Sequence, residues 1–317
     1  MSKILRKANK ISIVLPTYNE EKNVVILYNK LITIIKQLNI PQKEIIFVDD
    51  GSTDRTIENI KKIAEKDHDV KFLRLSSRVG HQISCFAGIK IAGGDIVISM
   101  DSDLQHPPEL IEQLYRKWQE GFDIVNSVRK DTIKRSFFKK LFSGLFYRII
   151  NKISDLDITP NTADFRLVSR NVVIELITYE DRDLFLRGII SNLLYKKAYV
   201  EYIAAERVHG ASKYDFRQSL RFGFMGIFYF SELPLKLSAY ASVLCFLFVL
   251  GFIIYELIQF ATGKTSEPGY ITLVLLINIY TIIILFVLSI IGVYINKIYH
   301  QTKRKPVFYV AEKVNIE

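Results

Sequence analysis

Two long stretches without a charged residue lie near the C-terminal end of the chain, and they restrict its possible folds most strongly. The first runs from residue 237 to residue 255, and the second from residue 268 to residue 296. As a helix, each stretch is long enough to cross about 30 Å of hydrocarbon. Buried core helices would have a similar composition, but too little chain remains at this end to cover them. We therefore expect two transmembrane helices within residues 237–296.

The basic residues around these stretches predict their orientation. The connection 261–270 carries one Lys and one Glu, whereas cations flank the two stretches on their other sides: Arg217, Arg221, Lys236, Lys297, Lys303, Arg304 and Lys305. Because positive charge is retained in the cytoplasm, we expect a multi-pass protein of the cell membrane with both termini cytoplasmic. The N-terminal apolar run, Ile11–Leu15, is too short for a signal peptide.

Composition excludes several other classes of protein. With 49% hydrophobic residues the chain is not disordered, and its two cysteines, Cys85 and Cys245, indicate no disulfide framework. The net charge of +10 is best explained by anionic membrane lipid, and no nucleic-acid recognition motif is present.

The aromatic-rich segment 216–236 fits either an amphipathic interfacial helix or an ordinary packing helix. Residues 297–317 are expected to form a basic cytoplasmic tail.

Residues 1–215 alternate between strand-like and helix-like patterns, which predicts an α/β cytoplasmic domain. Parallel neighbouring strands need crossover connections, so the expected sheet is doubly wound and mainly parallel, with ligands at the carboxyl ends of its strands. The expected strands are 11–16, 44–48, 70–75, 95–100 and 123–128, and the expected helices are 20–38, 53–66 and 82–92.

Acidic clusters directly follow two of these strands. One is Asp49-Asp50-Gly-Ser-Thr-Asp54, and the other is Asp101-Ser-Asp103. Each alone is also an ordinary turn or cap sequence. Together, at neighbouring strand ends, they predict a site for a divalent cation with oxygen ligands, Mg²⁺ or Mn²⁺, which shares its remaining positions with phosphate oxygens. The implied substrate is of the nucleoside-diphosphate type.

Three stretches closely resemble the inverting family-2 glycosyltransferases of the GT-A fold: Val14–Glu20 (VLPTYNE), Val48–Asp54 (VDDGSTD) and Met100–Glu109 (MDSDLQHPPE). Four more make the chain similar to polyprenyl-phosphate sugar transferases, the group of bactoprenol glucosyltransferases and dolichol-phosphate mannose synthases: residues 80–82, 164–167, 185–188 and 207–214. The resemblance covers nearly the whole chain. It implies a Rossmann-like GT-A domain followed by two membrane helices, which transfers one sugar to a polyprenyl phosphate at the cytoplasmic membrane face.

The resemblance also implies the residues that contact the nucleotide-sugar donor, for which UDP-glucose is the first expectation. Asp103 would bind the metal, and Asp101 would be a second ligand or contact the nucleotide or sugar. Gln105 would contact the donor pyrophosphate or the metal shell. The base and ribose pocket would be lined by Pro16, Tyr18, Glu20 and Asp50, with Asp49 and Asp54 supporting the turn or the ribose.

On the acceptor side, the resemblance places Asp164 at the reacting centre. A phosphate monoester has a second pKa near 6, so the nucleophile is already charged at neutral pH and needs no strong base. We therefore expect Asp164 to position the acceptor or the sugar. Cations must offset the repulsion between two anionic substrates, and the first candidates are Arg129, Arg207 and Lys213. For the other nearby cations, a solvated or lipid-facing surface is an equal alternative.

The chain departs from the family pattern at two places. Residues 76–82 read SSRVGHQ where the family usually has SRNFGHQ, and Ala163 replaces a usual glycine. These changes bear on donor contacts and on the space beside the sugar.

Mannose or N-acetylhexosamine donors are the alternatives to glucose. A processive polysaccharide synthase is less favoured, because such enzymes usually have a Gln-x-x-Arg-Trp motif and the only Trp of this chain is Trp118. A non-catalytic scaffold is less favoured, because Asp101 and Asp103 are intact. A homo-oligomer is expected, and a flippase is a candidate partner.

Overall fold

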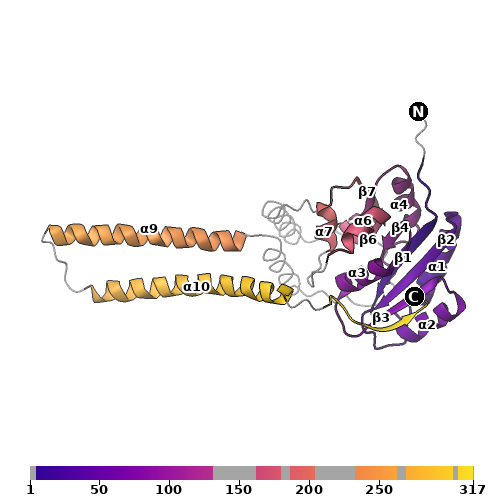
Figure 1. The fold of residues 1–317 in the computed structure, drawn as a ribbon, viewed down its shortest axis with the longest axis horizontal. Coiled ribbons are helices and arrows are strands. Elements are labelled where there is room, and N and C mark those ends of the chain that lie inside the picture. Colours follow the sequence, from indigo (N-terminus) through magenta and orange to yellow (C-terminus); the bar gives the residue numbers. More distant parts are fainter. Residues whose placement is uncertain are drawn as a thin grey trace. The chain divides into compact units, whose positions relative to one another are not determined.

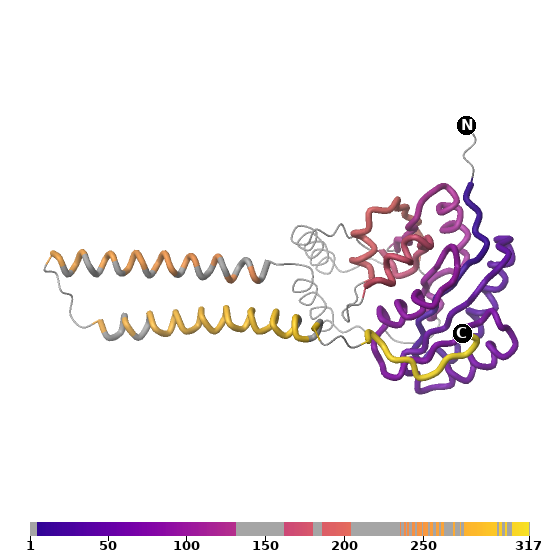
Figure 2. Tube along the Cα trace, viewed as in Figure 1, coloured from indigo at the N-terminus to yellow at the C-terminus, as the bar shows by residue number. Residues whose placement is uncertain are grey.

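The computed structural model describes residues 5–130, 162–179, 186–203, 233–262, 269–302 and 306–316. The described residues up to 203 form one compact unit together with residues 306–316, and residues 233–302 belong to a second unit. Figure 1 shows the helices and strands, and Figure 2 follows the same chain as a coloured trace.

The first unit is built on one eight-stranded sheet, with strand order β7-β5-β6-β4-β1-β2-β3-β8. Strand β1 pairs in parallel with β2 and β4, β2 with β3, and β5 with β7, whereas β6 is antiparallel to β4 and β5, and β8 is antiparallel to β3. The strands are β1 (Lys10–Thr17), β2 (Gln42–Asp49), β3 (Val70–Leu75), β4 (Ile96–Ser99), β5 (Ile124–Lys130), β6 (Thr162–Ser169), β7 (Lys197–Ile203) and β8 (Val310–Val314).

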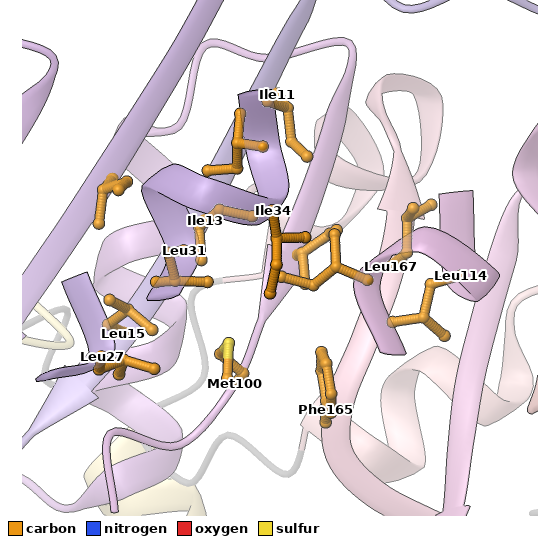
Figure 3. Packing of buried hydrophobic residues seen from close by; sticks show 14 of the residues in the cluster. Ile11, Ile13, Leu15, Leu27, Leu31, Ile34, Met100, Leu114, Phe165 and Leu167 are labelled. Atoms are coloured by element: carbon orange, nitrogen blue, oxygen red, sulfur yellow. The ribbon is translucent and has the colours of Figure 1, made fainter. Parts of the chain in front are cut away.

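Helices cover both faces of this sheet. The central strands β1, β2 and β4 are buried along most of their length, because alternate side chains enter hydrophobic cores on opposite faces. Ile13 and Leu15 pack beneath α1, as Figure 3 shows, whereas Val14 belongs to the core that contains α3. The helices of this unit are α1 (Val24–Gln37), α2 (Thr56–Lys66), α3 (His81–Ile91), α4 (Leu110–Gln119), α6 (Arg170–Leu176) and α7 (Leu186–Asn192).

Helix α3 lies unusually close to the sheet at Gly88. A Cβ atom at this position would lie 2.3 Å from Val14 Cγ1 and 3.0 Å from Val48 Cγ2. Only glycine fits this approach without displacing the neighbouring side chains. The close packing fixes α3 against β1 and β2, and it holds the start of the helix beside the carboxyl ends of these strands.

The second unit contains two long helices, α9 (Leu233–Ala261) and α10 (Tyr270–Thr302). Within α10, Leu276–Asn296 is long and apolar enough to cross a membrane, and it is the one such stretch in the described part of the chain. The predicted first stretch is helical, since residues 237–255 lie within α9. That α9 is a second membrane span stays a prediction.

The sheet agrees with a Rossmann-like domain, but it is mixed rather than mainly parallel. The predicted strands and helices are confirmed, with boundaries shifted by a few residues, whereas β6, β7 and β8 and the helices α4, α6 and α7 were not predicted. Residues 310–314 form β8, so the end of the predicted basic tail is part of the sheet. The predicted interfacial helix at 216–236 lies outside the described residues, apart from its last four residues, which begin α9.

Candidate active site

The loops after β1 and β2 are joined at the carboxyl edge of the sheet. The backbone N–H of Asn19 donates to Ser52 Oγ at 2.9 Å, and the N–H of Thr53 donates to Asn19 Oδ1 at 2.8 Å. Asn19 adopts a positive φ of 55°, which asparagine tolerates better than most residues. The N–H of Glu20 donates to Thr56 Oγ1 at 2.8 Å. These contacts hold the two predicted donor-binding loops together.

A second set of contacts joins the β1 loop to the loop after β4. Ser102 Oγ donates to the carbonyl oxygen of Pro16 at 2.8 Å, and it also lies 3.1 Å from Thr17 Oγ1. Ser102 is buried. It therefore fixes the segment between Asp101 and Asp103 against the end of β1, and it places Pro16 next to the predicted metal loop.

Asp49, Asp50 and Asp54 all stabilise loops in the structure. The carboxylate of Asp49 accepts the N–H groups of Gly51 and Ser52 at 3.2 Å, which is the turn-supporting role among those expected. Asp54 does the same for the N–H of Thr56 at 3.0 Å. Asp50 instead reaches the segment after β3: it accepts the N–H of Val79 at 2.7 Å and the N–H of Gly80 at 3.0 Å.

Tyr18 and Glu20, two predicted donor contacts, have neighbours of their own. The guanidinium carbon of Arg78 lies 4.1 Å from the centroid of the Tyr18 ring, a cation–π contact. Glu20 Oε2 accepts a hydrogen bond from Asn23 Nδ2 at 2.6 Å. Arg78 is one of the residues at which the chain departs from the family pattern. The departure thus lies directly beside a predicted nucleotide contact.

Asp101 is held by two histidines. His81 Nε2 lies 2.6 Å from Asp101 Oδ1, and His106 Nε2 lies 3.7 Å from Asp101 Oδ2. The backbone N–H of Asp101 also donates to His106 Nδ1 at 3.1 Å. Burial alone would raise the pKa of Asp101, but the hydrogen bond and positive charge of His81 and the charge of His106 lower it. Asp101 is therefore a carboxylate at neutral pH.

The pKa of His81, which contacts Asp101, changes in the opposite direction. Burial would lower the pKa of His81, but the hydrogen bond and charge of Asp101 and the charge of Asp164 raise it to about 9. His106 is buried, and its ring stacks on Phe165 with centroids 5.2 Å apart. Both histidines accordingly orient the Asp101 loop.

Asp103 and Gln105 lie on the same short loop. Asp103 Oδ1 accepts the backbone N–H of Gln105 at 3.1 Å, and the intervening Leu104 has a φ of 61°. Among the described residues, no group of three His, Cys, Asp or Glu side chains could hold a metal ion by itself. A cation on Asp101 and Asp103 would need oxygen atoms from a substrate or from water, which is the usual way in which Mg²⁺ is bound.

Asp164 on β6 stands in a cluster of donors and cations. Asp164 Oδ2 accepts from Gln82 Nε2 at 3.0 Å and lies 3.3 Å from Arg187 Nη2, while Oδ1 pairs with Arg166 Nη2 at 2.8 Å. His81 Nδ1 is 4.0 Å from Asp164 Oδ2. Burial would raise the pKa of Asp164, but the charges of Arg187, Arg166 and His81 lower it. Asp164 is therefore a weak base.

The carboxyl edge thus gathers two carboxylate sites and an imidazole that contacts both. The sequence matches the description "Glycosyl transferase family 2" over residues 12–177, a match that includes every site residue described so far except Arg187. The chain belongs to glycosyltransferase family 2. It is therefore a transferase, as the resemblance of its motifs implied.

Similarity to individual relatives extends over nearly the whole chain. An uncharacterized glycosyltransferase, YkcC of Bacillus subtilis, is 37% identical over 96% of this chain and 94% of its own length. The prophage bactoprenol glucosyl transferase homolog of Escherichia coli is 35% identical over 95% of this chain and 98% of its own. The bactoprenol glucosyl transferase of Shigella phage SfV is 35% identical over 96% and 99%. The narrower resemblance to bactoprenol glucosyltransferases is thereby confirmed.

Among solved structures, the likeness is more distant. A mannosyltransferase from Pyrobaculum calidifontis, solved with GDP-Man and Mn²⁺, aligns with 70% of this chain and 64% of its own. The identity is 17% and the TM-score is 0.48. A similarity of this size carries no argument about the ligands of the present glycosyltransferase.

The predicted phosphate-binding cations of the glycosyltransferase are only partly described. Arg129 lies at the exposed carboxyl end of β5, and Arg207 and Lys213 lie outside the described residues. Sequence reasoning did not assign roles to Gln82, Arg166 and Arg187, although all three belong to stretches that resemble the family. Arg166 lies two residues after Asp164 on β6, so the alternation of side chains along a strand could have predicted this contact. Gln82 and Arg187 come from α3 and α7, and no spacing in the sequence could have predicted that they meet Asp164.

Proposed function

We propose that this glycosyltransferase moves a single sugar from a nucleotide-sugar donor to a polyprenyl phosphate of the undecaprenyl type at the cytoplasmic face of the membrane. UDP-glucose is the first expected donor. The proposal is supported by the relatives named bactoprenol glucosyl transferase, which match over nearly their full length. It is also supported by Leu276–Asn296, an apolar helical stretch that would bring the enzyme to its lipid substrate.

The observation that carries the proposal is the position of His81. One imidazole ring lies 2.6 Å from Asp101 and 4.0 Å from Asp164. Asp101 belongs to the predicted metal and donor loop, whereas Asp164 is the carboxylate expected to face the acceptor. A donor diphosphate near the first and an acceptor near the second would be close enough for direct transfer.

The donor set of the Asp101–Asp103 loop fits a hard divalent cation. It offers carboxylate oxygens, which Mg²⁺ and Mn²⁺ prefer, and it leaves positions for diphosphate oxygens. When bound, such an ion would act as a Lewis acid that stabilises the departing nucleoside diphosphate. Asp103 and Asp101 would hold it, while Ser102 keeps their loop against β1.

Asp164 would position the reactants rather than remove a proton. An oxygen of the acceptor phosphate forms a bond to the anomeric carbon, while the bond from this carbon to the donor diphosphate breaks and the nucleotide leaves with the electron pair. The acceptor dianion has no proton to lose in this step. The lowered pKa of Asp164 agrees with a carboxylate that remains ionised and holds Arg166 and Arg187 in place.

Arg187 is the cation of this cluster best suited to meet a phosphate. Its side chain is part-exposed and lies 3.3 Å from Asp164, whereas Arg166 is buried. One guanidinium group can bind two oxygens of a phosphate at once, and it carries a permanent charge. Together with Arg129, and with Arg207 and Lys213 as predicted from the sequence, Arg187 would offset the repulsion between donor and acceptor. Attack from the side opposite the leaving group inverts the anomeric carbon.

The test is a transfer assay with the purified full-length protein. It is incubated in lipid vesicles with undecaprenyl phosphate, Mg²⁺ or Mn²⁺, and a panel of labelled nucleotide sugars. We expect label to enter the organic phase with UDP-glucose, and only when the polyprenyl phosphate is present. Transfer from GDP-mannose or from an N-acetylhexosamine donor, and not from UDP-glucose, would show that the proposed donor is wrong. No lipid-linked label with any donor would contradict the function itself.

A further inference from the structure

The C-terminal residues 306–316, which we name the C-terminal strap, return to the catalytic sheet. Strand β8 of the strap pairs antiparallel with β3 at the edge of the sheet, where it is drawn in yellow in Figure 1. Phe72 lies opposite Val314, and Leu75 lies opposite Val310. In the chain, the strap begins only a few residues after Thr302, where α10 ends.

Side chains attach the strap at both of its ends. Asn315 Nδ2 donates to the carbonyl oxygens of Ala64 and Val70, each at 2.9 Å. Glu312 pairs with Lys61 of α2 at 2.5 Å. At the other end, Phe308 packs against the hydrophobic core that contains α3 and α7. The strap therefore contacts α2 and a hydrophobic core to which α3 also contributes, and not only its neighbouring strand.

The strap also holds the segment that follows β3. The backbone N–H of Ser76 donates to the carbonyl oxygen of Tyr309 at 2.9 Å. Ser76 begins the segment 76–80, whose Val79 and Gly80 N–H groups bind the carboxylate of Asp50. Val79 packs against the same core as Phe308. One continuous set of contacts thus connects the strap to Asp50.

The same segment carries further groups of the site. Arg78 lies over the ring of Tyr18. The two residues that directly follow segment 76–80 are His81, which contacts Asp101, and Gln82, which contacts Asp164. Gly80 has a φ of 94°, a conformation that must be kept for α3 to begin where it does. Because glycine readily adopts other conformations, contacts at the ends of the segment are needed to keep this one.

We propose that the C-terminal strap positions segment 76–80 for binding of the nucleotide part of the donor, with Phe308 and Asn315 as positioning residues. This proposal rests on the proposed function, because Asp50 and Tyr18 are donor contacts only if the enzyme uses a nucleotide sugar. When the strap is released, the carboxylate of Asp50 and the ring of Tyr18 lose their fixed partners. Donor affinity then falls while the groups around Asp164 remain able to react.

The test uses two variants of the full-length protein and a matched control. Asn315→Gly removes the two side-chain hydrogen bonds, and glycine accepts the φ of 56° at this position. Phe308→Ala combined with Asn315→Gly also removes the packing contact. Lys313→Ala is the control, since it changes an exposed side chain on the same strand. Hydrogen exchange of residues 70–76 measures the release of the strap.

We expect the double variant to bind UDP in the presence of Mn²⁺ about tenfold more weakly, and Asn315→Gly about threefold more weakly. The KM for the nucleotide sugar rises by the same factors, whereas kcat, the KM for undecaprenyl phosphate and the Lys313→Ala control remain unchanged. A strap with no positioning role would leave UDP affinity unaltered. If the double variant does not fold, the UDP affinity of Asn315→Gly alone tests the proposal.

The proposal is overturned if hydrogen exchange shows that the strap is released while UDP affinity remains that of the wild type. It is also overturned if kcat falls in place of a rise in KM, or if exchange at residues 70–76 does not change in either variant. Failure of the proposed function gives a different result, because the wild-type protein itself would then form no lipid-linked sugar.

Discussion

Carboxylates with several polar partners occur at both ends of the central strands, and their exposure differs. Near the start of β2, Glu44 pairs with Lys10 and Lys71, each at 2.8 Å, and accepts hydrogen bonds from Ser12 and from the N–H of Gly93. Its side chain is 2% exposed. At the carboxyl edge, Asp101 is 35% exposed and Asp164 is 18% exposed. The first cluster is closed to solvent and the second is open.

A low pKa does not separate these two clusters. Burial would raise the pKa of Glu44, but the hydrogen bonds from Lys10, Lys71, Ser12 and Gly93 lower it to about 2. Asp101 and Asp164 are also lowered, by His81 and by arginines. What distinguishes the carboxyl edge is exposure, together with partners that a substrate could replace. A perturbed pKa marks a functional site only when the group is also accessible.

The largest effect is expected from the open cluster. Replacing Asp101 and Asp103 together by alanine should lower turnover about 10³-fold, or about 4 kcal/mol in the activation barrier. The unfolding midpoint, followed by the fluorescence of Trp118, should fall, because His81 loses the carboxylate that it contacts. Turnover is therefore measured at a temperature at which both proteins are folded. A loss of less than tenfold, in a sample with normal fluorescence, would contradict a metal-binding role for these residues.

The closed cluster should respond in stability and not in catalysis. Glu44→Gln should lower the free energy of unfolding by about 3 kcal/mol at pH 7, since a pKa lowered from 4.5 to about 2 corresponds to this amount. A depressed pKa gives stability that is complete above pH 4.5 and is lost as the pH falls toward 2. The difference should therefore shrink to about 1 kcal/mol at pH 3.

Urea unfolding in detergent, followed by Trp118, measures this difference at both pH values. The KM values of Glu44→Gln should equal those of the wild type at temperatures where both are folded. An equal difference at pH 3 and pH 7 would show that packing, and not charge, accounts for the loss. A changed KM would remove the contrast between the two clusters.

Asp164→Asn sharpens the role of the open cluster. We expect turnover to fall about 10²-fold, the cost of misplacing reacting groups, by the same factor from pH 6.5 to pH 8, which is below the pKa of about 9 of His81. The reason is that wild-type Asp164 is ionised throughout this range and the acceptor needs no base. Steady-state rates across this range are the measurement. If the loss disappears at high pH, Asp164 acts as a base and the positioning role is wrong.

The smallest effect is expected from a charge pair outside both clusters. Arg116 and Glu112 lie 2.6 Å apart on the exposed surface of α4. Glu112→Ala should change the free energy of unfolding by less than about 0.5 kcal/mol, and it should not change turnover. A larger loss in the same unfolding experiment would mean that this exposed ion pair stabilises the protein more than such pairs usually do.

The carboxyl edge could be predicted from the sequence to the extent that single strands carry it. Asp49 and Asp50 follow one apolar run and Asp101 and Asp103 follow another, so alternation of strands and helices was enough to bring them together. The partners of Asp164 could not be predicted in the same way. Arg166 is the exception, because residues two apart on one strand share a face. Gln82 and Arg187 come from α3 and α7, and only the folded sheet determines that they meet Asp164.

Strand β8 shows a second limit of sequence patterns. It has five residues, of which three are exposed and two are partly exposed, so it lacks the apolar run by which the other strands were recognised. Its position depends on pairing with β3 and on the hydrogen bonds of Asn315. Such a strand follows from tertiary contacts, and a pattern of charge near a membrane helix predicts only a tail.

The most direct test of the account is the dependence of UDP binding on Mn²⁺. We expect Mn²⁺ to increase the affinity of the wild-type protein for UDP at least about tenfold, which corresponds to about 1.4 kcal/mol, and to have no such effect on the Asp101→Ala, Asp103→Ala variant. Calorimetric titration of both proteins, with and without Mn²⁺, gives the four values. An equal increase in both proteins would contradict the assignment of these carboxylates to a metal-bridged nucleotide.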